Sequence, residues 1–243
     1  CLLAVPVLMA SENWDDHDRS ERTIAIDVAK NYLEHLDSNA ILFSNGDNDT
    51  YPLWYAQEVE GVRLDVRNVN MSLLGIDWYI NQVKQQVYNA SPVPSLLTND
   101  DYEGNKKNGV YVMKHKDCQK CINEIKGVID PKTKKRIICR KKIKKWKLSA
   151  ANAIKAIQET DQCPKNIFIP IDENNKINIK ITKKQILQSD IALLDILAHF
   201  NWERPLYFIS AYQSLIHQAG FDGIMQYIVR EGALDKLVPY KSL

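Results

Sequence analysis

The stretch AILFSNGDNDTYPLWY, residues 40–55, decides the fold of this chain. Residues 40–44 form a short apolar run of the kind that makes a buried strand. Residues 45–50 combine Asn, Gly and Asp, which favour turns because their side chains bond to nearby backbone or tolerate unusual dihedrals. Pro52 suits the first position of a helix, with Thr50 or Tyr51 as its cap. The sequence therefore predicts a strand, an acidic turn and a helix in succession.

The residues on either side of this stretch predict a βαβ unit. Upstream, Ser20 caps a predicted helix that runs to about Leu36, with apolar residues at helical spacing. Downstream, the helix over about 52–60 ends at Gly61, and residues 62–70 form a second predicted strand. Strand, helix and strand in this order make a right-handed unit with parallel strands. We predict a mixed, mainly parallel three-layer α/β fold with a Rossmann-like start.

The rest of the chain continues this alternation of helices and strands. The predicted elements are a helix over 77–88, a strand over 109–113, a hairpin of 127–129 with 136–138, a helix over 149–160, strands over 166–171 and 176–181, a helix over 182–200, a strand over 206–210, short helices within 211–232 and a last strand over 236–240. With 243 residues, 45% of them apolar, the chain can bury one large core. We expect a single domain over 11–243 with a Lys- and Cys-rich insertion at about 100–147.

The first residues, CLLAVPVLMA, contain no charge and no basic segment typical of a secretory signal. Residues 1–10 could form a buried strand or the end of a membrane helix. The polar run that follows contains Asp15, Asp16 and His17. Two carboxylates beside an imidazole could bind a divalent metal or supply acid–base groups. They could equally be the solvated start of a helix, where acids are favoured by the helix dipole.

The acidic turn also has two interpretations. Asp47, Asn48, Asp49 and Thr50 could bind a hard cation or a sugar hydroxyl, and Trp54 could stack on a sugar ring. A divalent cation is therefore the candidate cofactor. Alternatively, the turn bonds only to its own backbone and caps the helix. The spacing of an EF-hand and the glycines of a phosphate-binding loop are both missing.

The insertion contains most of the cysteines. Cys118 and Cys121 form one Cys-x-x-Cys pair, followed by the single residues Cys139 and Cys163. With His115 as a further ligand, they could hold zinc, although structural zinc sites usually have a second closely spaced pair. A disulfide within this set and unpaired thiols are the alternatives.

The positive charge is concentrated in the same insertion, although the net charge of the chain is only +2. The basic run Lys132–Lys147 includes interleaved Ile residues and a Trp. It could contact anionic lipid headgroups or form a solvated face. We expect no nucleic-acid partner. The sequence contains no nucleophile elbow, zinc-protease helix, dinucleotide fingerprint or kinase signature.

Four strings together resemble a known family. They are NWDDHDRS at 13–20, GDNDTYPLWYAQEVEG at 46–61, NW with RPLYF at 201–208, and REGAL with LVP at 230–239. They are similar to the C-terminal soluble part of large membrane proteins of Bacteroidetes, which resemble protein O-mannosyltransferases of the GT-C type. The resemblance covers most of the chain except about 90–165.

The resemblance implies a function without catalysis in this chain. In such proteins a multi-pass membrane half uses a lipid-phosphate sugar donor and contains the catalytic acid. This chain is then an accessory domain that recognises the acceptor polypeptide, covers the active site or holds the enzyme together. The resemblance also implies that it contacts the membrane half and lies on the periplasmic side of the inner membrane that anchors it. The alternatives from the residues are a metal-dependent enzyme that uses the acidic turns, or a purely structural or interaction domain.

Overall fold

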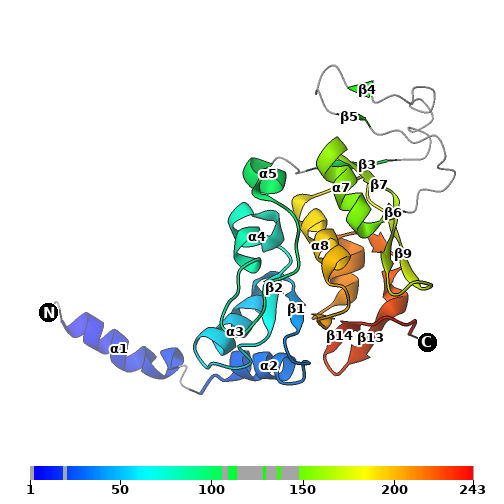
Figure 1. The fold of residues 1–243 in the computed structure, drawn as a ribbon. Helices are drawn as coiled ribbons and strands as arrows, with labels where there is room; N and C mark the ends of the chain where they lie inside the picture. The colour runs from blue at the N-terminus through cyan, green and yellow to red at the C-terminus, as the bar shows by residue number, and fades with distance from the viewer. Residues whose placement is uncertain are drawn as a thin grey trace.

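A five-stranded sheet lies at the centre of the fold. The computed structural model describes residues 3–18, 21–105, 109–113, 128–129, 136–137 and 148–242. The sheet has the order β13-β14-β11-β1-β2, with bounds Ile228–Glu231, Leu234–Leu237, Leu206–Phe208, Ile41–Ser44 and Arg67–Asn70 (Figure 1). Strands β11, β1 and β2 pair in parallel, and β14 and β13 add an antiparallel edge. The predicted mixed α/β fold and its βαβ start are confirmed.

Alternate residues of β1 enter two separate apolar cores, as expected for a strand covered on both faces. Leu42 packs with α2 (Ile24–Leu33) and α3 (Gly46–Glu58) on one face. Ile41 and Phe43 pack on the other face with α4 (Asp77–Val83) and α8 (Gln188–His199). The rings of Phe43 and Phe208 stack there with centroids 4.8 Å apart. The helices therefore cover the sheet on two sides, in three layers.

Smaller sheets extend the second core. One has the order β10-β3-β7 (Gln185–Ile186, Val110–Met113 and Gln162–Pro164), and the other β12-β9-β8-β6 (Phe221–Asp222, Lys176–Ile181, Asn166–Pro170 and Leu148–Ser149). The predicted hairpin pairs β4 (Val128–Ile129) with β5 (Arg136–Ile137). The remaining helices are α5 (Asn99–Tyr102), α7 (Ala150–Thr160), η1 (Leu73–Gly75), η2 (Glu103–Asn105), the π-helix η3 (Tyr212–Gln218) and η4 (Ile224–Tyr227).

Several predicted boundaries are wrong, each because of a nonlocal contact or a local turn. The helix expected from Thr182 begins at Gln188, since β10 first pairs with β3. The helix expected to reach Tyr88 ends at Val83, and Tyr88 adopts a positive φ of 50° in a turn that replaces it. The second strand begins only at Arg67, and the last strand ends at Leu237.

The N-terminal segment is helical. Helix α1 (Ala4–His17) joins the apolar start and the polar run that follows, so the alternative of a strand over 1–10 is wrong. Its apolar side chains are exposed, and the helix extends away from the rest of the chain (Figure 1). Among the helices of the described residues, none combines the length and the apolar character that crossing a bilayer requires.

A buried ion pair on α8 holds the segment that leads away from α4. The Oδ2 atom of Asp195 accepts the backbone N–H groups of Leu96 and Leu97, at 2.9 and 3.3 Å. Nδ1 of His199 lies 2.9 Å from the Oδ1 atom of Asp195. This interaction raises the pKa of His199 above its ordinary value of 6.5, against the opposite effect of burial.

We expect a pH dependence of stability from this pair. A raised folded-state pKa means that the imidazolium contributes its full stabilisation below about pH 6.5 and loses it as pH rises through the folded pKa. Urea unfolding at pH 6 and pH 8.5 measures the difference in the free energy of unfolding. His199→Gln should reduce that difference. An unchanged difference in this variant would place the pH dependence elsewhere.

Candidate functional site

The acidic turn is the first turn of α3 and not a loop before it. Helix α3 begins at Gly46 with Asn45 as its N-cap, so the prediction of a cap at Thr50 or Tyr51 is wrong. Gly46 has a φ of 72°, a conformation that favours glycine, and this allows the chain to enter the helix six residues early. Pro52 consequently lies inside the helix.

Thr50 is a structural residue at the centre of a buried network. Its Oγ1 atom donates to the carbonyl oxygen of Gly46 at 2.7 Å and accepts from Nδ2 of Asn70 at 2.9 Å. It also lies 2.8 Å from Oγ of Ser44. These contacts join β1, α3 and β2 through one side chain. Thr50 is completely buried, and its hydroxyl bonds within this network.

Among the other residues of the turn, Asp49 bonds to the backbone of the turn, whereas Asp47 and Asn48 are exposed. The Asp49 carboxylate accepts the backbone N–H of Asn45 at 3.4 Å, and its partial burial raises the pKa of Asp49. This contact fits the alternative in which the turn caps its own helix. Asp47 and Asn48 are exposed, and their role as ligands stays a prediction. The Asn45 side chain bonds to Ser214 of η3 at 3.0 Å, which ties the turn to the π-helix.

The predicted metal ligands are not brought together among the described residues. In that part of the chain no group of three or more His, Cys, Asp or Glu side chains is placed to hold an ion. Asp15, Asp16 and His17 lie on α1, whereas the acidic turn belongs to α3. His115, Cys118, Cys121 and Cys139 lie outside the described residues, as does most of the basic run 132–147. Cys163 is a buried free thiol, and burial raises its pKa to about 12.

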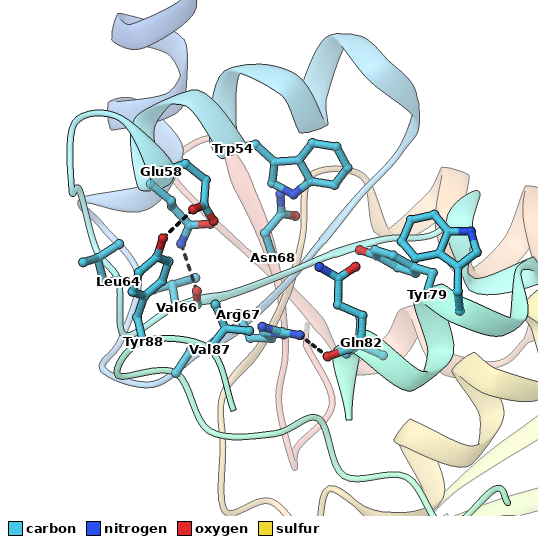
Figure 2. Close-up of a pocket in the computed structure, with 14 residues that line it drawn as sticks. Trp54, Glu58, Leu64, Val66, Arg67, Asn68, Tyr79, Gln82, Val87 and Tyr88 are labelled. Carbon is cyan, nitrogen blue, oxygen red and sulfur yellow. Dashed lines mark hydrogen bonds between the residues drawn. The ribbon is translucent and has the colours of Figure 1, made fainter. Parts of the chain in front are cut away.

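A pocket that the sequence analysis did not predict lies at the edge of the central sheet. It has a volume of about 330 Å³ and opens between α3 and α4, beside β2 (Figure 2). The lining residues are Trp54, Gln57, Glu58, Leu64, Val66, Arg67, Asn68, Trp78, Tyr79, Gln82, Val83, Val87, Tyr88 and Ala90. We call it the β2-edge pocket. Its size is that of a site for a small ligand or a short segment of chain.

Two buried donors in this pocket lack partners among the described residues. Arg67 and Asn68 are each only 7% exposed. Nη2 of Arg67 donates to the carbonyl oxygen of Gln82 at 2.7 Å, but its Nε has no partner. Oδ1 of Asn68 accepts from Oγ of Ser44 at 3.0 Å, but its Nδ2 has none. Because buried polar groups are nearly always hydrogen-bonded, oxygen atoms of a ligand or of ordered water would satisfy these two donors.

Burial also makes the charged form of the Arg67 guanidinium less stable than it would be in water. Desolvation lowers the pKa of Arg67, while Tyr79 and Glu58 act in the opposite direction. The guanidinium still carries its charge at neutral pH, because an arginine titrates far above it. A ligand with carbonyl, hydroxyl or carboxylate oxygens would stabilise this group, since a buried cation gains most from direct hydrogen bonds.

Aromatic side chains form the rim of the β2-edge pocket. Trp54 projects from α3, Trp78 from α4, and Tyr88 from the turn after α4. Trp78 is 57% exposed, and the hydroxyl of Tyr88 bonds to Glu58 (Figure 2). Aromatic faces provide a large apolar area with little conformational freedom to lose, so they suit a recognition surface.

Sequence reasoning identified only Trp54 of this pocket. The available signal was the string RNVN, residues 67–70, in which three polar side chains occupy a strand buried at every position. Polar side chains in a buried strand require hydrogen-bond partners. The pattern alone did not reveal that β2 is the last strand of the sheet, so the partners could not be located.

The fold and the pocket define an α/β domain with a pocket at the open edge of its central sheet and, among the described residues, no assembled metal centre. The chain belongs to the protein family described as TMEM260-associated domain 2, which matches residues 25–243. This family is a domain of TMEM260-like proteins, and TMEM260 is a membrane protein that resembles protein O-mannosyltransferases. No curated protein and no solved structure matches the chain.

Proposed function

We propose that this chain is a non-catalytic accessory domain of a membrane-embedded protein O-glycosyltransferase, and that it binds the acceptor polypeptide. The observation that carries the proposal is the β2-edge pocket with its two unpartnered buried donors, on Arg67 and Asn68. The family supports the glycosyltransferase context. The sugar donor of the whole protein is then a lipid-phosphate sugar, used by a membrane half that contains the catalytic acid.

The proposal also specifies where the domain lies and what it contacts. The domain contacts the membrane half of its own protein. It lies on the periplasmic side of the inner membrane that anchors it. Residues Lys132–Lys147 contact anionic lipid headgroups. The exposed apolar side chains of α1 support a contact with an apolar environment at this end of the domain. The alternative of a metal-dependent enzyme has no comparable support among the described residues.

Removing the rim tryptophan tests the proposal. In the full-length protein, Trp78→Ala should raise the KM for the acceptor polypeptide about tenfold and leave kcat nearly unchanged, because the pocket binds acceptor but touches no reacting atom. Trp78 is more than half exposed, so its removal should leave the fold intact. The measurement is the rate of sugar transfer at varied acceptor concentration, with purified protein in lipid.

The matched control is Tyr111→Ala. Tyr111 is 69% exposed on β3 and does not line the β2-edge pocket. Its removal deletes a comparable aromatic surface and should leave the KM for the acceptor unchanged. If both variants retain the KM of the natural protein, the pocket does not bind the acceptor and the proposed function is wrong.

A further inference from the structure

We propose that the β2-edge pocket binds the backbone of the acceptor, by pairing a single extended residue of it with the peptide groups of Asn68. This inference rests on the proposed function and specifies the ligand as a short extended peptide segment. The backbone pairing itself uses atoms that every residue except proline possesses, so any sequence preference comes from the side chains beside it.

The direction of the backbone groups in β2 follows from its pairing with β1. The N–H of Arg67 donates to the carbonyl oxygen of Ala40, and the N–H of Met71 donates to that of Ser44, each at 2.9 Å. In a parallel pair, alternate residues direct both backbone groups toward one neighbour. Residues 67, 69 and 71 therefore face β1. The N–H and the C=O of Asn68 face the opposite way, toward the open edge of the sheet.

Side chains close this edge on both sides of Asn68. Nε2 of Gln57 donates to the carbonyl oxygen of Val66 at 2.9 Å. The hydroxyl of Tyr79 accepts the N–H of Asn70 at 2.8 Å. Such covering is how proteins protect an edge strand from uncontrolled pairing. Of residues 66, 68 and 70, only Asn68 then has both its N–H and its C=O uncovered by these side chains, and Asn68 lines the pocket, so the site pairs with one residue rather than a whole strand.

The two unpartnered donors, Nε of Arg67 and Nδ2 of Asn68, lie on the two faces of β2, beside the side chains of such a segment. Successive side chains of β2 lie on opposite faces of the sheet, with Asn68 toward α3 and Arg67 toward α4 (Figure 2). A residue paired with Asn68 places its side chain on the same face of the sheet as the Asn68 side chain. On that face it lies beside Nδ2 of Asn68 and the ring of Trp54. The neighbouring residues of the segment direct theirs to the side of Arg67 and Trp78. Both free donors favour side chains with oxygen acceptors, such as serine, threonine or the acidic residues.

Amide hydrogen exchange of the whole 243-residue chain tests this pairing. The probe is the capped peptide Ac-Ser-Thr-Val-Thr-Ser-NH2 at saturating concentration. We expect the exchange rate of the Asn68 amide to fall at least tenfold, because its N–H gains a partner. The Arg67 amide is the internal control, since it already donates to Ala40 and should not change. N-methylation of the central residue removes the donor for the Asn68 C=O and should weaken binding about tenfold.

Three results would overturn the pairing. They are an unchanged Asn68 exchange rate at saturating peptide, equal affinity for peptides methylated at each position, and equal protection of Asn68 by methyl mannoside or N-acetylglucosamine in place of the peptide. The proposed function has a separate readout, the KM of Trp78→Ala. Peptide binding that depends on Trp78 but leaves Asn68 unprotected would reject backbone pairing and retain acceptor recognition.

Discussion

Arg63→Ala is expected to lower the free energy of unfolding by about 3 kcal/mol. Arg63 lies in the connection between α3 and β2 and reaches back to the end of α2. Its Nη1 donates to the carbonyl oxygens of Leu33 and Leu36, each at 2.8 Å, and its Nη2 donates to that of Asp37 at 3.0 Å. Leu33 is the last residue of α2, and Leu36 and Asp37 lie in the turn that follows, so one guanidinium ties the end of the helix to this turn.

The carboxylate of Asp65 completes this arrangement. It accepts from both Nε and Nη2 of Arg63, at 2.8 and 3.0 Å, and from the backbone N–H of Asn39 at 3.0 Å. These bonds lower the pKa of Asp65 to about 2. Loss of Arg63 therefore removes hydrogen bonds to three carbonyl groups and leaves a partly buried carboxylate without its cation.

Urea denaturation of the isolated chain measures the effect, and Arg230→Ala is the matched control. Arg230 also forms an ion pair, with Asp235 at 2.6 Å, but its side chain is 61% exposed. Exposed pairs contribute less than about 1 kcal/mol, so the control should change little. Equal effects of the two substitutions would mean that the contacts of Arg63 with α2 do not stabilise the fold.

Thr50→Val is expected to lower the free energy of unfolding by about 2 kcal/mol, although the two side chains have nearly the same shape. The change removes a donor to Gly46 and an acceptor for Asn70. Asn70 and Ser44 are both buried, at 2% and 0% exposure, so no water replaces the lost hydroxyl. The cost arises mainly from these neighbours, which remain in the core with unsatisfied groups.

The control for Thr50→Val is Asp49→Asn in the same turn. Asp49 is half-buried, and burial raises the pKa of Asp49, so the folded state disfavours its charge. A neutral amide keeps an oxygen acceptor for the N–H of Asn45 and should retain or slightly increase stability at neutral pH. Thermal unfolding of both variants gives the comparison. A larger loss for Asp49→Asn than for Thr50→Val would mean that the turn depends on its charge.

The local elements were predictable where one periodicity governs a segment. The alternation of residues 176–181 predicted β9, and Ser149 predicted the start of α7, where its Oγ accepts the N–H of Asn152. The acidic turn was placed correctly at the carboxyl end of β1. Its conformation was not, because Pro52 suggested a helix start that the entry at Gly46 overrides. One glycine with a positive φ changed the role of Thr50 from candidate ligand to core residue.

The sequence by itself determined the class of fold, the βαβ start and the burial of β1, since these depend on apolar spacing along a few residues. The tertiary structure alone decided the site. Arg67 and Asn68 form a pocket because β2 is an outer strand and α4 folds back beside it. Whether a strand lies at an edge depends on pairing between segments such as β1 and β11, which are far apart in the chain. No local pattern encodes that pairing, so the unpartnered donors appear only in three dimensions.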